Sequence, residues 1–313
     1  MSLREEADAN ARDEDGRTTL HVAVEYNERM NAFDGRFAAL QITGKRDYQE
    51  DSFGLLDERD LGPDCGEHAV LLVADGMGGH VGGAIASDLL RKTFVEAYPK
   101  SSGPIVDRLR DCLDAANGAI AAAVAENPAL DSMGSTLVAA VVTSEGLHWI
   151  SVGDSPLWLF RAGQLERLNA DHSMAPLLAD LVAEERMTAE DAARHPSRHS
   201  LRSVVMGDEI PLIDVSSQPV AVEEGDRVVL GSDGLLTLDE QEIADILEKT
   251  RDAPLEDSAA ALIQAVEAAE NPHQDNTTVL LYAPGGGAEL GAVAVGEGKL
   301  LRTSRDQNAR QDC

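Results

Sequence analysis

Cysteine, aromatic residues and basic residues are all scarce in this 313-residue sequence. The three cysteines, Cys65, Cys112 and Cys313, form no CxxC pair and do not make an even set, which argues against a disulfide scaffold and a cysteine-based zinc site. No apolar run approaches the roughly 20 residues that cross a bilayer, and the acidic residues 1–15 are unlike a secretory signal. These absences predict a protein of a reducing compartment, the cytoplasm, that does not enter a membrane.

Positive charge is a further deficit. The chain has 26 Lys and Arg against 56 Asp and Glu, which gives a formal net charge of −30 at pH 7. Such a charge repels nucleic acid and anionic lipid, so neither is an expected partner, whereas metal cations are attracted. Most of these acids are expected on a solvated surface, and only those inside apolar runs need a further explanation.

Composition divides the chain into three parts. Residues 1–35 are polar, acidic and weakly periodic, and residues 284–313 begin with Pro284-Gly285-Gly286-Gly287 and continue with small and polar residues. Both compositions are typical of flexible appendages. The hydrophobic content of 43% is enough for one large core, which we assign to residues 36–283.

Apolar runs of strand length, rich in β-branched residues, predict the strands of this core. Three of them follow one another through short turns with no room for a crossover helix, which only antiparallel neighbours allow. Their nearly continuous apolar character requires cover on both faces. The sequence therefore predicts an α+β fold, a β-sandwich of two antiparallel sheets flanked by helices on both outer faces. The predicted strands are 37–42, 69–74, 136–142, 147–152, 157–160, 227–230 and 277–282.

Helical periodicity appears between these runs, and the apolar stripes are interpreted as core faces. Over residues 171–209 the pattern changes to charged, helix-forming residues with one apolar face and a capping sequence that begins at Thr188. An inserted helical flap and an ordinary surface helical hairpin both fit this segment. The predicted helical stretches outside it are 81–94, 106–124, 243–247 and 262–266.

Acidic residues stand at the ends of several predicted strands. The strand that ends at Ala74 runs directly into Asp75-Gly76-Met77-Gly78-Gly79. A charge there is costly unless it is compensated, and the glycines permit the close approach of main-chain carbonyls that a hard cation requires. One such acid is equally well explained as a turn or helix cap. The arrangement recurs at Asp154, Asp233 and Asp275, which indicates one shared site, and oxygen ligands favour Mg²⁺ or Mn²⁺ over zinc.

The segment Gly44–Ser52 places an acidic pair beside a guanidinium group. Arg46 could clamp a phosphate through two parallel hydrogen bonds, and Glu50 could join the metal site. A charged hairpin turn is the simpler interpretation if the segment is considered alone.

Several other motifs fail on spacing. A GxGxxG fingerprint would need its third glycine where Val81 stands, and no GxxxxGK[ST] sequence occurs. The serine of Gly231-Ser232-Asp233-Gly234 is displaced by one position from a GxSxG elbow. No HExxH motif is present, so the histidines are interpreted as surface or structural residues; those considered are His68, His148, His172, His195 and His199.

The chain carries these segments as an ordered set of motifs: Arg46-x-x-Gln49-Glu50-Asp51, Asp75-Gly76-Met77-Gly78-Gly79, Gly134-Ser135-Thr136, Gly153-Asp154-Ser155, Ser232-Asp233-Gly234-Leu235 and Asp275-Asn276-Thr277-Thr278. The set closely resembles that of the metal-dependent protein phosphatases of the PPM or PP2C-like family, in the form of its bacterial stand-alone enzymes. The resemblance covers about residues 37–282. It is specific because every element occurs in family order, and it implies a helix-flanked β-sandwich.

The resemblance also implies roles for the matching residues. Asp75 would bridge two cations. Glu50 and the main-chain carbonyl of Gly76 would complete the coordination of one cation, and Asp233 and Asp275 that of the other.

Three further matching residues would support this centre. Asp51 would act from behind the metal ligands, and Arg46 would bind the phosphate. Asp154 matches a position that, with Asp233, holds a third and weaker cation in bacterial members.

Three positions depart from the family pattern. Met77 stands where eukaryotic members commonly have a histidine proposed as general acid, so the proton donor is left open; His80 is nearby but does not match. Pro156 replaces a usual arginine, which puts a structural contact in doubt. His199-Ser200 replaces a frequent asparagine-bearing stretch, so substrate contacts of the flap are not carried over.

The activity implied is hydrolysis of phosphoserine and phosphothreonine in proteins, with two or three Mn²⁺ or Mg²⁺ ions. Two cations sharing Asp75 would lower the pKa of a bridging water and so give a hydroxide, while Arg46 neutralises charge on the phosphate. The expected partners are phosphorylated proteins, the targets of a bacterial Ser/Thr kinase, and the expected state is a monomer. Two alternatives stay open: a catalytically silent regulatory member of the family, and a phosphomonoesterase for small molecules.

Overall fold

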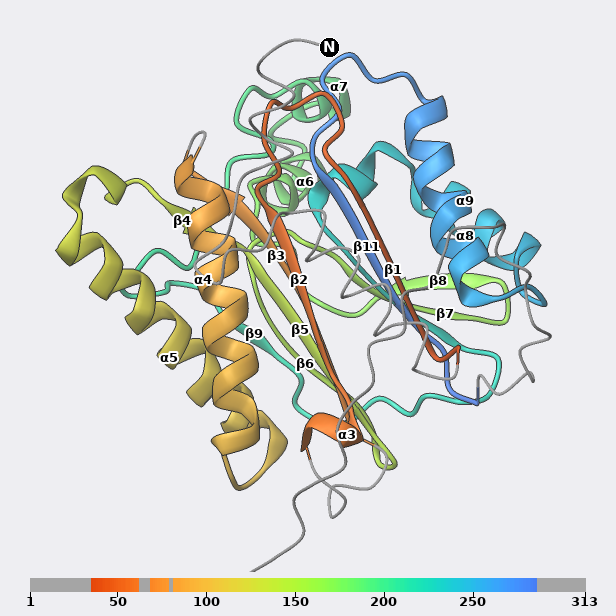
Figure 1. The fold of residues 1–313 in the computed structure, drawn as a ribbon. Helices are drawn as coiled ribbons and strands as arrows, with labels where there is room; N and C mark the ends of the chain where they lie inside the picture. The colour runs from red at the N-terminus through yellow and green to blue at the C-terminus, as the bar shows by residue number, and fades with distance from the viewer. Residues whose placement is uncertain (1–34, 62–67, 79–80, 286–313) are drawn as a thin grey trace, which may run out of the picture.

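The computed structural model describes residues 35–61, 68–78 and 81–285 (Figure 1). The predicted N-terminal extension, except for residue 35, and the predicted tail from residue 286 lie outside the described residues. Cys65, Cys313, Gly79 and His80 lie outside them too. Within the described ranges, no helix has both the length and the apolar character needed to span a bilayer.

Two antiparallel sheets form the centre of the molecule (Figure 1). The strand order is β1-β11-β10-β7-β8 in the first sheet and β2-β3-β5-β6-β9 in the second, with β4 paired to β3. The predicted α+β sandwich is thereby confirmed. The strands are β1 (Phe37–Ile42), β2 (Asp51–Leu56), β3 (His68–Met77), β4 (Gly134–Ser135), β5 (Leu137–Thr143), β6 (Gly146–Val152), β7 (Leu157–Arg161), β8 (Gln164–Arg167), β9 (Asp214–Val215), β10 (Arg227–Gly231) and β11 (Thr277–Tyr282).

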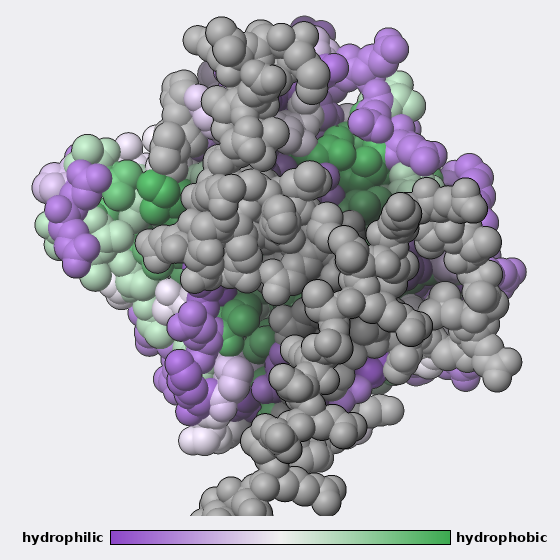
Figure 2. Space-filling model, in the orientation of Figure 1, coloured by the Kyte–Doolittle hydropathy of each residue, from purple (hydrophilic) through white to green (hydrophobic). Residues whose placement is uncertain are grey.

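Helices cover both outer faces of this pair of sheets. Helices α4 and α5 pack on the second sheet, and α8 and α9 pack on the first (Figure 1). Figure 2 shows hydrophilic side chains, in purple, along the outer side of the α8–α9 layer. The helices are α3 (Glu58–Leu61), α4 (Val81–Ala97), α5 (Ile105–Glu126), α6 (Ala175–Ala183), α7 (Ala189–Ala193), α8 (Glu240–Lys249) and α9 (Leu255–Ala268), and the 3₁₀ turns are η2 (Tyr98–Lys100), η3 (Pro128–Leu130) and η4 (Asp233–Thr237).

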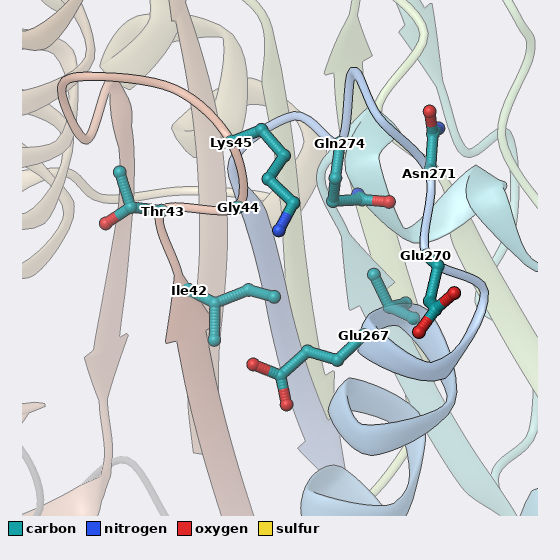
Figure 3. Close-up of a pocket in the computed structure, with 9 residues that line it drawn as sticks. Ile42, Thr43, Gly44, Lys45, Glu267, Glu270, Asn271 and Gln274 are labelled. Carbon is teal, nitrogen blue, oxygen red and sulfur yellow. The ribbon is translucent and has the colours of Figure 1, made fainter.

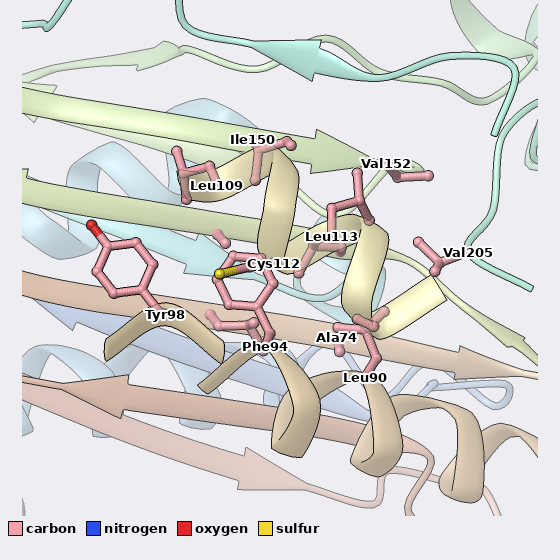
Figure 4. Packing of buried hydrophobic residues seen from close by; sticks show 14 of the residues in the cluster. Ala74, Leu90, Phe94, Tyr98, Leu109, Cys112, Leu113, Ile150, Val152 and Val205 are labelled. Atoms are coloured by element: carbon pink, nitrogen blue, oxygen red, sulfur yellow. The ribbon is translucent and has the colours of Figure 1, made fainter. Parts of the chain in front are cut away.

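Strand β3 shows why the strand sequences are almost continuously apolar. Leu72 and Ala74 point to the helices, where they join the cluster that contains Phe94 and Leu113 (Figure 4). Leu71 and its alternate neighbours point the other way, into the cluster between the sheets. Because successive residues of a strand face opposite sides, a strand buried on both sides needs an apolar residue at each position.

Strand β2 was not among the predicted strands. Asp51, Ser52 and Gly54 have low strand propensity, so the segment lacks the local signal. Its pairing comes instead from β3, with Asp51 opposite Asp75 and Leu56 opposite Val70. The short strands β4, β8 and β9 were missed for the same reason, since they depend on their neighbours.

Candidate metal centre

The strand-end acids of both sheets meet at one end of the sandwich. Asp75 lies in β3, two residues before its end, and Asp51 is its register partner at the start of β2. Asp233 begins η4 just after β10, and Asp275 lies just before β11; both strands belong to the first sheet. Asp154 follows β6. We call these five residues the acid cluster.

Mutual electrostatic effects show how close the members of the acid cluster lie. The pKa of Asp75 is raised well above its ordinary value, first by burial and then by the charges of Asp51, Asp233, Asp154 and Asp275. Burial, followed by the charge of Asp233, raises the pKa of Asp154 to about 7. The pKa of Asp233 is likewise raised by burial and by Asp275. The cluster therefore holds more negative charge than its surroundings compensate.

Asp51 links the two sheets through its carboxylate. One oxygen, Oδ2, accepts hydrogen bonds from Ser232 Oγ at 2.6 Å and from Thr278 Oγ1 at 2.7 Å. Both donors belong to the first sheet or follow it directly, whereas Asp51 lies in the second. The pKa of Asp51 is raised to about 7, first by burial and then by the charges of Asp233 and Asp275, against the opposing effect of these two hydrogen bonds.

Main-chain contacts fix the position of Asp75. Its carbonyl accepts hydrogen bonds from Thr136 N at 2.8 Å and Ser135 Oγ at 3.0 Å, and its N–H donates to Thr136 Oγ1 at 3.1 Å. Thr136 Oγ1 also lies 2.7 Å from Ser155 Oγ. The Gly134-Ser135-Thr136 motif was predicted only by resemblance, and its physical task is to hold the backbone at Asp75.

Gly76 allows three segments to approach closely. A Cβ at this position would lie 2.1 Å from Gly83 O and 2.5 Å from Glu50 O, so no other residue fits without displacing the backbone. Gly76 N donates to Glu50 O at 3.0 Å. A Cβ at Gly83 would in turn lie 2.4 Å from Glu50 Oε1. The Glu50 carboxylate is thus brought to the first turn of α4, next to the carbonyl of Gly76.

Asn276 holds the loop that carries Arg46, a role that the sequence did not predict. Its Nδ2 donates to Thr43 O at 2.8 Å and Tyr48 O at 2.9 Å, and its Oδ1 accepts from Glu50 N at 2.7 Å. Because these partners lie more than 220 residues away in sequence, no local pattern could reveal them.

Arg46 forms an ion pair with Asp275. The guanidinium side chain is 52% exposed and the carboxylate 34%, so the pair lies at the solvent boundary of the acid cluster. The residue predicted to bind phosphate therefore contacts a residue predicted to bind a cation.

The segment 171–209 lies beside the acid cluster. It contains α6 and α7, and isolated bridges join Ser173 to Leu201 and Ser135 to Val205. His172 at its start is buried and accepts a hydrogen bond at Nδ1 from Gly153 N at 3.2 Å, which agrees with a structural role. His199 lowers the pKa of Asp233, so this exposed residue lies near the cluster, and no sequence signal indicated that position.

The residues that depart from the family pattern are placed as follows. Met77 ends β3 and is 41% exposed. Pro156 accepts a main-chain hydrogen bond from Gly231 N at 3.1 Å, which ties the loop after Asp154 to the end of β10.

The donors of the acid cluster fit a hard divalent cation in kind. Asp51 Oδ1 and Asp233 Oδ1 are buried and have no hydrogen-bond partner, and such an oxygen costs free energy unless a donor or cation compensates it. Carboxylate and carbonyl oxygens are the ligands that Mg²⁺ and Mn²⁺ prefer. In the described residues, no three His, Cys, Asp or Glu side chains already stand in coordinating geometry. The oxygen atoms of the cluster are thus of the kind that binds such cations, although the side chains are not drawn together around a common point.

Fold and site together define a class of protein, the helix-flanked double β-sheet with a carboxylate centre at one end. A protein phosphatase 2C family model matches residues 61–274. The chain belongs to this family.

Relatives of known function support the assignment. The serine/threonine protein phosphatase PstP of Mycobacterium tuberculosis is 33% identical over 214 residues, 68% of this chain and 40% of PstP, so the match spans less than half of that relative. The serine/threonine phosphatase Stp of Listeria welshimeri is 31% identical over 242 residues, 75% of this chain and 90% of Stp. The crystal structure of the PstP catalytic domain in complex with two manganese ions has a TM-score of 0.62 and 30% identity, and the match covers 79% of this chain and 97% of that one.

Proposed function

We propose that this chain is a metal-dependent protein phosphatase that hydrolyses phosphoserine and phosphothreonine. One observation carries the proposal: five aspartates from both sheets converge at one end of the sandwich, and buried oxygens of Asp51 and Asp233 lack hydrogen-bond partners. A centre of this kind is costly unless it binds cations. The relatives are named serine/threonine phosphatases, and one was solved with manganese.

The acid cluster would hold Mn²⁺ or Mg²⁺. Asp75, whose pKa is raised by four other acids of the cluster, would be shared between two cations. Glu50 and the carbonyl of Gly76 would serve one cation, and Asp233 and Asp275 the other. Bound cations would supply the hydroxide nucleophile that bridges them and would neutralise charge on the phosphoryl oxygens.

The remaining residues act by position and charge. Arg46, which is half-exposed at the cluster's edge, would turn from Asp275 to a phosphate and bind two of its oxygens. Asp51 holds the two sheets together at the centre through Ser232 and Thr278. Asp154, whose pKa is raised to about 7 by burial and by the charge of Asp233, would bind a third, weaker cation together with Asp233.

Phosphorylated proteins, the products of a Ser/Thr kinase, are the proposed substrates. The test is release of phosphate from a phosphothreonine peptide with Mn²⁺ or Mg²⁺, with chelator, and with the variants Asp233→Asn and Asp275→Asn. We expect chelation to abolish turnover and each variant to reduce kcat/KM at least about a hundredfold, as expected when a group that stabilises transition-state charge is removed. Asp245→Asn, which removes an exposed acid of α8, is the matched control.

Four results would contradict the proposal. Turnover that survives chelation, or that is equal in Asp233→Asn and wild type, would exclude the metal centre. Faster turnover of phosphorylated metabolites than of any phosphopeptide would favour the small-molecule phosphomonoesterase, and absence of turnover with a fully bound metal would favour the silent regulatory member.

A further inference from the structure

A pocket of about 300 Å³ lies next to the acid cluster but is not part of it (Figure 3). One wall is the end of β1 and the turn after it, with Ile42 and Lys45, and the other is the end of α9 and the loop that follows, with Glu267 and Glu270. We call it the α9 pocket. Pockets for small ligands span about 300–1,000 Å³, so this one is suited to a single side chain. The full lining is Ile42, Thr43, Gly44, Lys45, Val266, Glu267, Glu270, Asn271 and Gln274.

The walls of the α9 pocket are joined to the acid cluster by the chain itself. Lys45 and Gln274 each directly precede a residue of the site, namely Arg46 and Asp275, and those two residues form an ion pair. Lys45 N donates to Gln274 O at 2.8 Å. A Cβ on Gly44 would lie 2.4 Å from Asp275 O. The two walls are therefore held together tightly, and a ligand in the pocket would lie close to Arg46 and Asp275.

The charge of the α9 pocket favours a cation. Glu267 lies in the last turn of α9 and Glu270 in the turn that follows the helix; both are exposed, and neither forms a salt bridge with any residue in the described part of the chain. The end of a helix carries partial negative charge, and the last turn of α9 has no basic residue to offset it. Lys45 on the opposite wall offsets only one of the two carboxylates.

The uncharged part of the pocket suits a long aliphatic stem. Val266 is buried and Ile42 is half-buried, so methylene groups can pack against them, while the half-buried Asn271 adds an amide group. Lysine and arginine combine an apolar stem with a charged end in this way. A phosphate or a carboxylate ligand would instead meet two like charges.

We propose that the α9 pocket is a specificity site that binds one lysine or arginine side chain of the phosphorylated polypeptide, within a few residues of the phosphorylated one. The inference rests on the proposed phosphatase function and adds a substrate class to it. Recognition of this kind acts on the ground state and the transition state alike, so it lowers KM rather than raising kcat. It also weakens at high ionic strength, because exposed charges are screened.

The experiment compares phosphothreonine peptides that carry one arginine at successive positions on either side of the phosphothreonine with the same peptides carrying glutamine there. We expect a three- to tenfold higher kcat/KM for arginine at one or two positions, carried by KM and reduced by 0.5 M KCl. In the double variant Glu267→Gln/Glu270→Gln this ratio is expected to fall to near one. Lys45→Gln is expected to raise it, because the carboxylates lose their internal counter-charge.

Glu256→Gln is the matched control, since it removes the same charge from the first turn of α9, and it is expected to keep the wild-type ratio. The inference is overturned if the wild-type kcat/KM is equal for the arginine and glutamine peptides at every position. It is also overturned if the double variant keeps the wild-type preference for arginine. Both results still require metal-dependent turnover of the glutamine peptides, so they are distinct from failure of the phosphatase function.

Adding spermidine to the assay with the glutamine peptide tests whether the α9 pocket binds a free amine instead of a substrate side chain. We expect spermidine to have the same effect on kcat/KM in wild type and in the Glu267→Gln/Glu270→Gln variant. A change that disappears in the double variant would assign the α9 pocket to a free amine and overturn the proposal.

Discussion

At the scale of single residues, Asp51 is the member of the acid cluster with the clearest structural task. Its buried carboxylate is bonded to Ser232 and Thr278 through one oxygen, while the other oxygen has no donor. Such a group is neutral at low cost and charged at high cost, because burial and two neighbouring acids oppose ionisation. Cation binding would reverse this balance.

We therefore expect Asp51→Asn to reduce the pH dependence of stability in the presence of chelator. The folded pKa of Asp51 is about 7 against an ordinary value of 3.8, so the folded state binds the extra proton. Its contribution to stability is complete below pH 3.8 and is lost as the pH rises to about 7, by at most about 4 kcal/mol. Urea unfolding of both proteins between pH 4 and 8 tests this, and parallel curves would contradict it.

Strand-end position was enough to identify most of the acid cluster from the sequence. Asp75, Asp154, Asp233 and Asp275 each interrupt or end an apolar run, where a charge is conspicuous. The parts that were missed, such as the contacts of Asn276 and the approach of His199 to Asp233, join segments far apart in sequence. A hydrogen bond between segments far apart in sequence does not change the hydrophobic pattern of either segment, so the sequence does not reveal it.

At the scale of elements, the end of α8 depends on a buried arginine. Arg227 in β10 is 5% exposed and donates to Thr250 O and Arg251 O, both at 2.7 Å, and to Ser258 Oγ at 2.6 Å. These carbonyls lie past the last turn of the helix, where no helical donor is available. Arg227 therefore connects the first sheet to both helices of its outer layer.

Arg227→Met is expected to lower the free energy of unfolding by about 3 kcal/mol, because several buried acceptors lose their donor. Arg251→Met is the control, since that side chain is 48% exposed and forms a long ion pair with Glu248 at 3.5 Å. A change of roughly 0.5 kcal/mol or less is expected there. Urea unfolding at neutral pH measures both, and equal losses would contradict the role of Arg227.

The end of the segment 171–209 is fixed to α5 by close contact at Gly207. Its φ is +92°, and a Cβ would lie 2.8 Å from Ala121 Cα. Asn117 Oδ1 accepts from Gly207 N at 2.8 Å, and Asn117 Nδ2 donates to Asp208 O at 2.8 Å. The segment is thus attached to the helical layer as well as to the sheet.

Gly207→Ala is expected to cost about 3 kcal/mol, from positive φ and overlap together. Gly163→Ala separates the two effects, because Gly163 has φ +78° with open space around its Cβ position, and it should cost only about 1 kcal/mol. Thermal unfolding with bound Mn²⁺ compares them. Equal costs would show that the contact with Ala121 relaxes without penalty.

Elements with a strong apolar pattern were predicted, and those without one were not. β5 and β6 occupy the predicted runs to within one residue. β2 escaped prediction because Asp51, Ser52 and Gly54 obscure it, and only its pairing with β3 defines it. Pairing is a property of two segments together, so the apolar pattern of one segment alone is an incomplete guide.

At the scale of the whole molecule, a pairing between strands far apart in sequence closes the first sheet beside the acid cluster. β1 pairs with β11 over its full length, from Phe37 opposite Tyr282 to Ile42 opposite Thr277. This pairing places the Arg46 loop beside Asp275. The short connections between strands were enough to predict an antiparallel sandwich. The pairing of β1 with β11 could not be predicted, because no local sequence feature links two segments so far apart.

The concentration of acids at this closure predicts how the whole molecule responds to cations. The chain carries a net charge of −30, and in chelator the acid cluster adds buried repulsion that divalent cations would remove. Binding at a concentration of about 100 times Kd adds about 2.7 kcal/mol of stability, equivalent to a rise in Tm of about 5–10 °C for a domain of this size. We expect Mn²⁺ at pH 8 to produce this rise in wild type and a much smaller one in Asp75→Asn.

Asp75→Asn is the decisive variant because four other acids raise the pKa of Asp75. Removing its charge should stabilise the chelated protein while weakening its response to Mn²⁺, two effects of opposite sign that general damage to the fold would not produce. KCl at matched ionic strength controls for screening of surface charge, which falls off over about 10 Å at 0.1 M salt. An equal rise in Tm in both proteins would place the cations away from Asp75 and remove the basis of the proposed mechanism.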